Sequence, residues 1–242
     1  MNEKSKILII VEGAKTDFRL MEHLFKIYEL NIKYEIVSYN TNIYTLYNEM
    51  FKEKAPNSLD LLLILKEHER DVEKKKIFDD NYSDILLIFD LDPQDPKYSE
   101  SKITKMMGYF IESSDMGKLY INYPMVEAFY HMKSIPDYEY DRYYATFDEL
   151  KSHTYKQRVN QENRNRSYSK FAVNRSECNI VIRQNIDKAY NLLYLPDKTD
   201  IPESLQILET QLNKIKAEDR VAVLCTCAFF IPEYNRKLIE IQ

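Results

Sequence analysis

Two apolar runs, each ending in carboxylates, constrain the fold of this chain more than any other feature of its sequence. Residues 7–11 read ILIIV and lead directly into Glu12, while residues 85–89 read ILLIF and lead into Asp90 and Asp92. Such runs are typical of strands buried on both faces of a parallel sheet. Because the carboxyl ends of parallel strands meet at one edge of a sheet, we expect these acids to converge there. Alternation along an extended segment also predicts that Asp90 and Asp92 point the same way.

Helical spacing between and beyond these runs predicts an α/β fold, a mainly parallel sheet flanked by helices. The pattern predicts strands at residues 7–11, 34–38, 84–90, 118–122 and 221–225, the last returning to the sheet, and helices at about 15–30, up to 50, from 61, after Ser99, from Pro124, near 182–193 and at 202–216. The charged run KEHERDVEKKK is interpreted as a solvated face. Gly13 is expected to serve a tight strand-to-helix turn after Glu12.

The chain divides by composition into three parts. Residues 1–133 are expected to form an α/β core, residues 134–175 a basic, tyrosine-rich insertion or lobe, and residues 176–242 C-terminal helices with a strand that completes the domain. With 242 residues and 44% hydrophobic side chains, the chain has enough apolar material to bury a core.

Charge and cysteine content narrow the class of protein. A net charge of −5 argues against a protein that coats nucleic acid with a basic surface, but it leaves a metal-dependent nuclease open, because its acids are neutralised by the metal. Three cysteines without zinc-type spacing predict buried thiols in a reducing cytosol. No apolar run is long enough for a membrane helix, and the N-terminal run is too short for a signal peptide, so we expect a cytoplasmic protein.

Converging carboxylates predict a divalent metal site. Glu12, Asp90 and Asp92 would repel one another unless a hard cation such as Mg²⁺, or alternatively Mn²⁺, occupied the cluster. Such an ion polarises a phosphoryl oxygen and lowers the pKa of an attacking water, which is the chemistry of phosphodiester cleavage. Taken singly, Glu12 or Asp92 is equally well explained as a turn or helix-cap residue.

The Glu-Gly of IIVEGAKTD, followed downstream by the Asp-x-Asp of LLIFDLD, resembles the toprim family over roughly residues 5–130. The resemblance implies a toprim-like core in which Glu12, Asp90 and Asp92 bind a divalent metal. It is closest to the compact toprim nucleases of bacterial phage defence: the RloB-like proteins, the overcoming-lysogenization-defect (OLD) nucleases and the toprim effectors of PARIS-type systems. That likeness implies a toxic antiviral endonuclease acting on tRNA, other RNA or DNA, with an ATPase partner protein.

Two further details carry this closer resemblance. Asp17 follows the Glu-Gly, and YINYPMVEAFYH resembles an Asn-Pro-x-x-Glu region in which Tyr123 interrupts the Asn-Pro pair. Carried over, Asp17 and Glu127 would complete the acidic centre. No motif marks a catalytic lysine; Lys170 is the candidate, and a solvated lysine in a basic loop is its alternative interpretation.

The stretch RVNQENRNRSYSKFAVNR offers guanidinium groups for phosphates and rings for stacking on unpaired bases, or forms an exposed loop. His131 is expected to lie on the protein surface or behind Glu127. Asp95, after Pro93, is interpreted as a turn residue that could add a ligand.

Two other functions stay open at this point. A non-catalytic toprim-like module would bind nucleic acid or a partner protein. FDLDPQD also resembles the nucleophile motif of haloacid-dehalogenase-like phosphatases, with Asp90 as the nucleophile. Self-association into a homodimer is a further expectation.

Overall fold

The computed structural model describes residues 6–30, 32–51, 60–114, 116–196 and 200–239. It divides into two compact units, each built from separate stretches of the chain. The first unit comprises Met1–Glu22, Leu30–Phe89 and Lys97–Tyr120, and the second comprises His23–Glu29, Asp90–Pro96 and Ile121–Gln242. The three-part division expected from composition stays a prediction.

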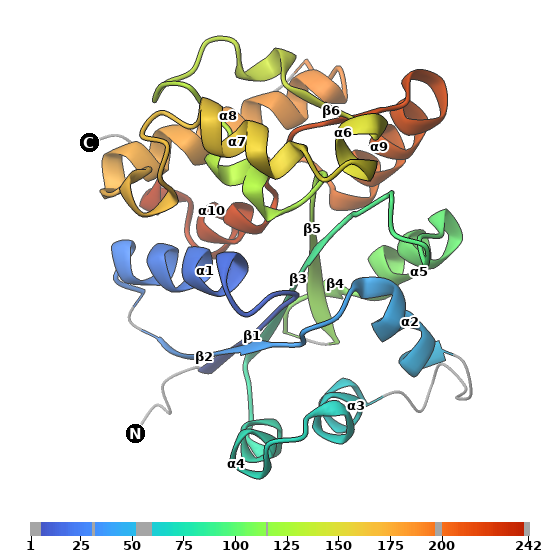
Figure 1. Cartoon of the computed structure of the whole chain (residues 1–242). Coiled ribbons are helices and arrows are strands. Elements are labelled where there is room, and N and C mark those ends of the chain that lie inside the picture. Colours follow the sequence, from blue (N-terminus) through green and yellow to red (C-terminus); the bar gives the residue numbers. More distant parts are fainter. Residues whose placement is uncertain (1–5, 31, 52–59, 115, 197–199, 240–242) are drawn as a thin grey trace. The chain divides into compact units, whose positions relative to one another are not determined.

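The first unit is built on a five-stranded sheet with the order β2-β1-β3-β5-β4 (Figure 1). Its strands are β1 (Lys6–Val11), β2 (Lys33–Ser38), β3 (Asp84–Asp90), β4 (Ile111–Glu112) and β5 (Gly117–Asn122). β1 lies parallel to both β2 and β3, and the short β4 pairs antiparallel with β5. Residues 7–11 are buried, as expected for a central strand. The α/β class and the mainly parallel sheet are confirmed.

Helices connect these strands. They are α1 (Thr16–Ile27), α2 (Ile43–Phe51), α3 (Leu61–His68), α4 (Val72–Lys75), the 3₁₀ helix η2 (Lys76–Asp79) and α5 (Glu100–Tyr109). Figure 1 shows α2 beside α5, and the two helices are in contact. Asp60 caps α3 by accepting a hydrogen bond from the N–H of Leu63. Ser99 precedes α5 as predicted, but its side chain makes no cap hydrogen bond.

The second unit is mostly helical. Its elements are η3 (Val126–Tyr130), η4 (Tyr140–Arg142), β6 (Tyr144–Thr146), α6 (Phe147–Lys151), α7 (Tyr155–Glu162), η5 (Tyr168–Lys170), α8 (Arg175–Leu192), α9 (Ser204–Glu218), β7 (Arg220–Ala222), η6 (Cys227–Phe229), α10 (Phe230–Tyr234) and η7 (Arg236–Leu238). The predicted insertion therefore contains regular structure: α6 begins with a capping box in which Thr146 and Glu149 exchange hydrogen bonds.

The last strand does not return to the main sheet as predicted, apart from one isolated bridge in which Leu224 and Tyr123, the residue after β5, exchange backbone hydrogen bonds of 2.8 Å. β7 pairs antiparallel with β6 in a separate two-stranded sheet. The side-chain amide of Gln211 bonds both the N–H and the C=O of Ala222, at 2.9 and 2.8 Å. The amide therefore satisfies the backbone N–H and C=O of Ala222 that a neighbouring strand would otherwise bond. This explains why an apolar segment at this position does not join the main sheet.

Candidate metal centre

The backbone around Glu12 extends the parallel sheet of the first unit beyond β1. The Glu12 N–H donates to the C=O of Ile88 at 3.0 Å, and the Glu12 C=O accepts from the N–H of Asn40 at 2.9 Å. Glu12 thus stands at the carboxyl edge of the sheet, as the sequence predicts.

Gly13 serves a different purpose from the one expected. Its backbone is not in the left-handed region, so no tight turn demands a glycine there. Instead, a Cβ at this position would lie 2.8 Å from Oδ2 of Asp17, a contact too short for real atoms. Asp17, near the start of α1, is buried. Gly13 therefore makes room for the Asp17 carboxylate, which supports the pairing of these two positions in the motif.

Asp90 and Asp92 belong to the second unit. Asp90 is buried at the end of β3, and its Oδ1 accepts a hydrogen bond of 2.8 Å from the N–H of Val126. Asp92 has a positive φ of 39°, so the segment is not extended at this point and the expected alternation of the two carboxylates fails. The Asp92 N–H donates to Pro124 at 3.2 Å, and this turn sets the direction of the side chain.

Asp95 takes the turn role expected of it. Its N–H donates to the C=O of Asp92 at 2.9 Å, while the Gln94 side chain donates to Oδ1 of Asp92 at 3.0 Å. Asp92 is therefore held by its own loop.

Glu127 lies on the single 3₁₀ turn η3 rather than on the predicted helix. Pro124 follows a cis peptide bond and stands outside this turn, which begins at Val126. Glu127 is only 3% exposed, and its Oε1 lies 3.2 Å from Nζ of Lys156. Its Oε2 is buried and, among the described residues, has no hydrogen-bond partner. A buried carboxylate oxygen without a partner is costly and suits a missing cation or donor.

Lys156, on α7, is the residue of this cluster that the sequence did not disclose. Burial lowers the pKa of its ammonium group, but the neighbouring carboxylates, Glu127 first, outweigh burial and leave that pKa above its usual value. Asp90 and Asp92 contribute to the same effect. No motif surrounds Lys156, and only the fold of α7 places it beside Glu127, so spacing alone offered no signal.

The same charges act on Asp92. Burial raises the pKa of its carboxyl group, the Gln94 hydrogen bond and the charge of Lys156 lower it, and the charge of Glu127 raises it again. The net result is a pKa of the Asp92 carboxyl group above its ordinary value. The residue is partly exposed to solvent. Asp90, Asp92, Glu127 and Lys156 therefore form one electrostatically linked group, which we call the acid–lysine cluster.

Lys170 is not among the groups found to influence this cluster. It is exposed at the end of η5, and in the described part of the chain no ion pair joins its ammonium group to Asp92 or Glu127.

The arginines of the basic stretch serve mainly internal contacts. Arg158 pairs with Glu149 at 2.8 Å, Arg164 pairs with Glu177 at 2.8 Å, and Arg175 donates to the C=O of Leu238 at 3.0 Å. These guanidinium groups hold the second unit together.

His131 is buried, against the expectation of a surface position. Its Nδ1 lies 3.2 Å from the hydroxyl of Tyr155, and its Nε2 lies 3.1 Å from Oε2 of Glu162. Burial lowers the pKa of this imidazole to about 4, in spite of the Glu162 carboxylate. His131 is therefore a neutral structural histidine at neutral pH.

The donors of the acid–lysine cluster fit Mg²⁺ or Mn²⁺ by their chemistry, since all are carboxylate oxygens. Among the residues that the structure describes, no three His, Cys, Asp or Glu side chains stand together as a complete ligand set. Mg²⁺ usually takes only one or two carboxylates and fills its shell with water and substrate phosphate oxygens. Glu12 and Asp17 belong to the first unit and the cluster to the second, so their convergence on one ion stays a prediction.

No helix in the described part of the chain has the length and apolar character to span a membrane. Comparisons with protein-family models, with curated proteins and with solved structures gave no match. The toprim resemblance therefore stays a prediction from the motifs quoted above.

Proposed function

We propose that this chain is a Mg²⁺-dependent endonuclease that cleaves nucleic-acid phosphodiesters at the acid–lysine cluster. The observation that carries the proposal is the state of Glu127, a buried carboxylate with one oxygen on Lys156 and the other without a hydrogen-bond partner in the described structure. Asp90 and Asp92, whose charges act on the same lysine, supply the further donors. The toprim-like motifs support the same assignment.

Each side chain has a distinct part in this proposal. Asp92 and Glu127, with Asp90, would hold the divalent ion, which supplies charge stabilisation at the phosphoryl group when bound. The Val126 N–H fixes the orientation of Asp90, and the Gln94 amide fixes that of Asp92. Lys156 offsets the negative charge of the cluster and offers N–H donors to a phosphate oxygen.

Cleavage of labelled tRNA, single-stranded RNA and duplex DNA by the purified chain, with Mg²⁺ and with EDTA, tests the proposal. We expect Mg²⁺-dependent cleavage of at least one substrate, and we expect Asp92→Asn and Glu127→Gln to lower its rate roughly 100-fold or more, because each removes a charged ligand without changing side-chain size. Wild-type rates in both variants would exclude this site. Mg²⁺ binding without cleavage of any substrate would favour the non-catalytic module.

A pair of lysine variants tests the part of Lys156. Lys156→Gln should slow cleavage at least about tenfold, because Glu127 loses the ammonium group that lies 3.2 Å from its Oε1. Lys151→Gln, in the preceding helix, is the matched control and should keep the wild-type rate, since its ammonium lies over the Phe147 ring. Equal rates for Lys156→Gln and the control would contradict the assignment. Lys170→Gln, measured in the same assay, should keep the wild-type rate if Lys156 is the lysine that serves cleavage.

The biological setting is proposed from the resemblance. We infer an antiviral effector in the cytoplasm, toxic to its own cell when active and held in check by an ATPase partner, with a homodimer as the expected assembly. Three free, buried cysteines are in keeping with a reducing compartment. Loss of full-length tRNA or chromosomal DNA in cells that make the wild type, but not Glu12→Ala, tests this setting.

A further inference from the structure

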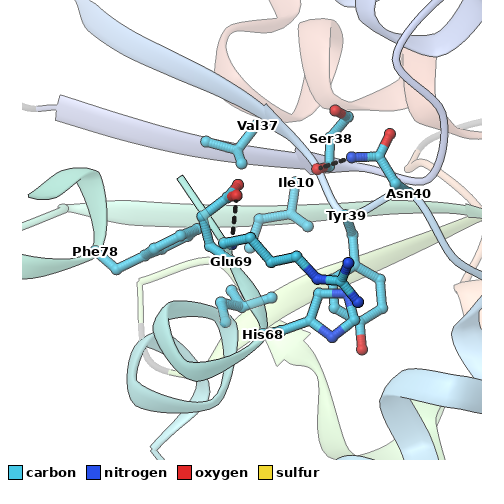
Figure 2. A pocket seen from close by; sticks show the side chains of 10 residues that line it. Ile10, Val37, Ser38, Tyr39, Asn40, His68, Glu69 and Phe78 are labelled. Atoms are coloured by element: carbon cyan, nitrogen blue, oxygen red, sulfur yellow. Dashed lines mark hydrogen bonds between the residues drawn. The ribbon is translucent and has the colours of Figure 1, made fainter. Parts of the chain in front are cut away.

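The first unit contains a cavity of about 390 Å³ that the proposed nuclease centre does not use. Its lining comes from the ends of β1 and β2, from the segment after β2, and from the end of α3 onward (Figure 2). The volume falls in the range of small-molecule sites, which are concave and mostly apolar with a few placed polar groups. The cavity also lies at the carboxyl ends of two parallel strands, β1 and β2, where ligands bind in open α/β sheets.

One end of this cavity combines apolar side chains with the carboxylate of Glu69. Ile10 and Val37 are register partners on neighbouring strands, so their side chains share one face of the sheet. In the view of Figure 2 the Phe78 ring lies at this end, away from Tyr39 and Asn40. An aromatic ring beside aliphatic side chains suits a flat, apolar ligand group such as a nucleobase.

The other end carries an oriented histidine. Nδ1 of His68 lies 3.1 Å from Oε1 of Glu49, and the Tyr39 hydroxyl donates to Oε2 of the same carboxylate at 2.5 Å. The His68 ring also packs on the Tyr39 ring, with centroids 4.5 Å apart. Because a carboxylate only accepts, Nδ1 carries the proton toward Glu49, and Nε2 is the nitrogen left for a ligand.

Arg70 adds a cation to the lining. Its backbone N–H is taken by the Glu69 carboxylate at 2.7 Å, but no carboxylate partner of its guanidinium occurs in the described part of the chain. An unpaired guanidinium beside an oriented imidazole is suited to a phosphate group. Nδ2 of Asn40 donates to the C=O of Ser38 at 3.1 Å, which leaves Oδ1 as an acceptor for a sugar hydroxyl.

We propose that this cavity binds a nucleoside monophosphate. The base lies against Phe78, Val37 and Ile10. The anionic oxygens of the phosphate accept from the guanidinium of Arg70, and a protonated phosphate oxygen donates to Nε2 of His68. The Glu69 carboxylate is fixed by the N–H groups of Arg70 and Asp71, so it presents a rigid acceptor to ring N–H donors, a feature that favours guanine.

Titration calorimetry of the full chain with guanosine 5′-monophosphate in EDTA tests this proposal without any contribution from nuclease activity or its metal. We expect saturable binding of one equivalent, with guanosine and inorganic phosphate each binding more weakly, because each carries half of the recognised groups. Arg70→Gln and His68→Gln should each weaken the binding at least about tenfold. Arg142→Gln, an exposed arginine paired with Glu139 in the second unit, is the matched control and should bind as the wild type does.

Two results would overturn the proposal. The first is the absence of binding to the wild type at millimolar ligand. The second is binding that both cavity variants retain at full strength. Phe78→Leu, which keeps the site apolar, separates a local effect from misfolding. It should weaken the binding of guanosine 5′-monophosphate more than the binding of inorganic phosphate, whereas an unfolded variant would bind neither. A failure here leaves the cleavage proposal untouched, since cleavage is assigned to other residues.

Discussion

Glu127 shows most clearly how single residues in this chain depend on partners far away in the sequence. Its position is named by a motif, but the charge that balances it, Lys156, stands outside every motif. Sheet geometry predicted only the acids at strand ends, Glu12, Asp90 and Asp92, whereas Glu127 was named by the resemblance alone. It could not predict the lysine, because α7 approaches η3 only through tertiary packing.

At Gly13 the structure predicts a loss of function without a loss of stability. In Gly13→Ala the new Cβ displaces the Asp17 carboxylate, the end of a side chain that can rotate away. The free energy of unfolding should change by no more than about 1 kcal/mol, since alanine also restricts the unfolded chain. Cleavage should fall if Asp17 serves the metal centre. Urea denaturation and the cleavage assay measure the two effects, and full activity in this variant would remove Asp17 from the site.

At His131 the structure predicts a pH-dependent stability. The folded state holds this imidazole neutral, with its pKa lowered to about 4, whereas the unfolded chain takes up the proton near its usual value of about 6.5. The stabilisation is therefore complete above about pH 6.5 and is lost as the pH falls toward 4, by up to about 1.4 kcal/mol for each pH unit.

The contribution of His131 is measured by difference. Urea unfolding of the wild type and of His131→Gln at pH 7.5, 6 and 5 should give curves that converge at low pH, because the variant lacks the titrating group. Parallel curves would mean that the pKa of His131 is the same in the folded and the unfolded chain, which would contradict the burial effect.

Among the elements, α8 organises the second unit through buried polar side chains. Asn185 is fully buried on this helix: its Oδ1 accepts from the Tyr140 hydroxyl at 2.6 Å and from the Cys225 N–H at 2.8 Å, and its Nδ2 donates to Val181 at 2.9 Å. Lys188, three residues on, donates to the backbone of Tyr140 at 2.7 Å. The helix was predicted from its apolar spacing, but these polar contacts were not, because periodicity reports burial and not hydrogen-bond partners.

Asn185→Leu should destabilise the protein strongly. The leucine leaves the Tyr140 hydroxyl and the Cys225 N–H buried without their acceptor, at a cost of about 2–4 kcal/mol. Asn191→Leu, on the exposed side of the same helix, controls for the change of residue type and should cost less than about 1 kcal/mol. Chemical denaturation of the two variants checks the difference, and equal losses would contradict the account of α8.

For the whole molecule, the class of fold was easier to predict from the sequence than the grouping of strands into sheets and of segments into compact units. The parallel sheet follows from apolar runs that need burial on both faces, and β1 and β3 occur where those runs lie. The position of β7 outside the main sheet could not be predicted from the apolar pattern, because it depends on the side chain of Gln211, which bonds the backbone of Ala222 in this strand. The division into two compact units also cuts across the chain order, with Asp90–Pro96 grouped with distant residues, which no local pattern records.

The central claim, that the acid–lysine cluster holds a divalent ion, is tested most directly by Mn²⁺ binding to the purified chain, measured by electron paramagnetic resonance. We predict one saturable site in the wild type, weakened at least about tenfold in Asp92→Asn and in Glu127→Gln. Glu162→Gln, which removes a partly buried acid that faces His131, should bind Mn²⁺ as the wild type does. Equal affinity in all four proteins, or no binding at all, would contradict the account.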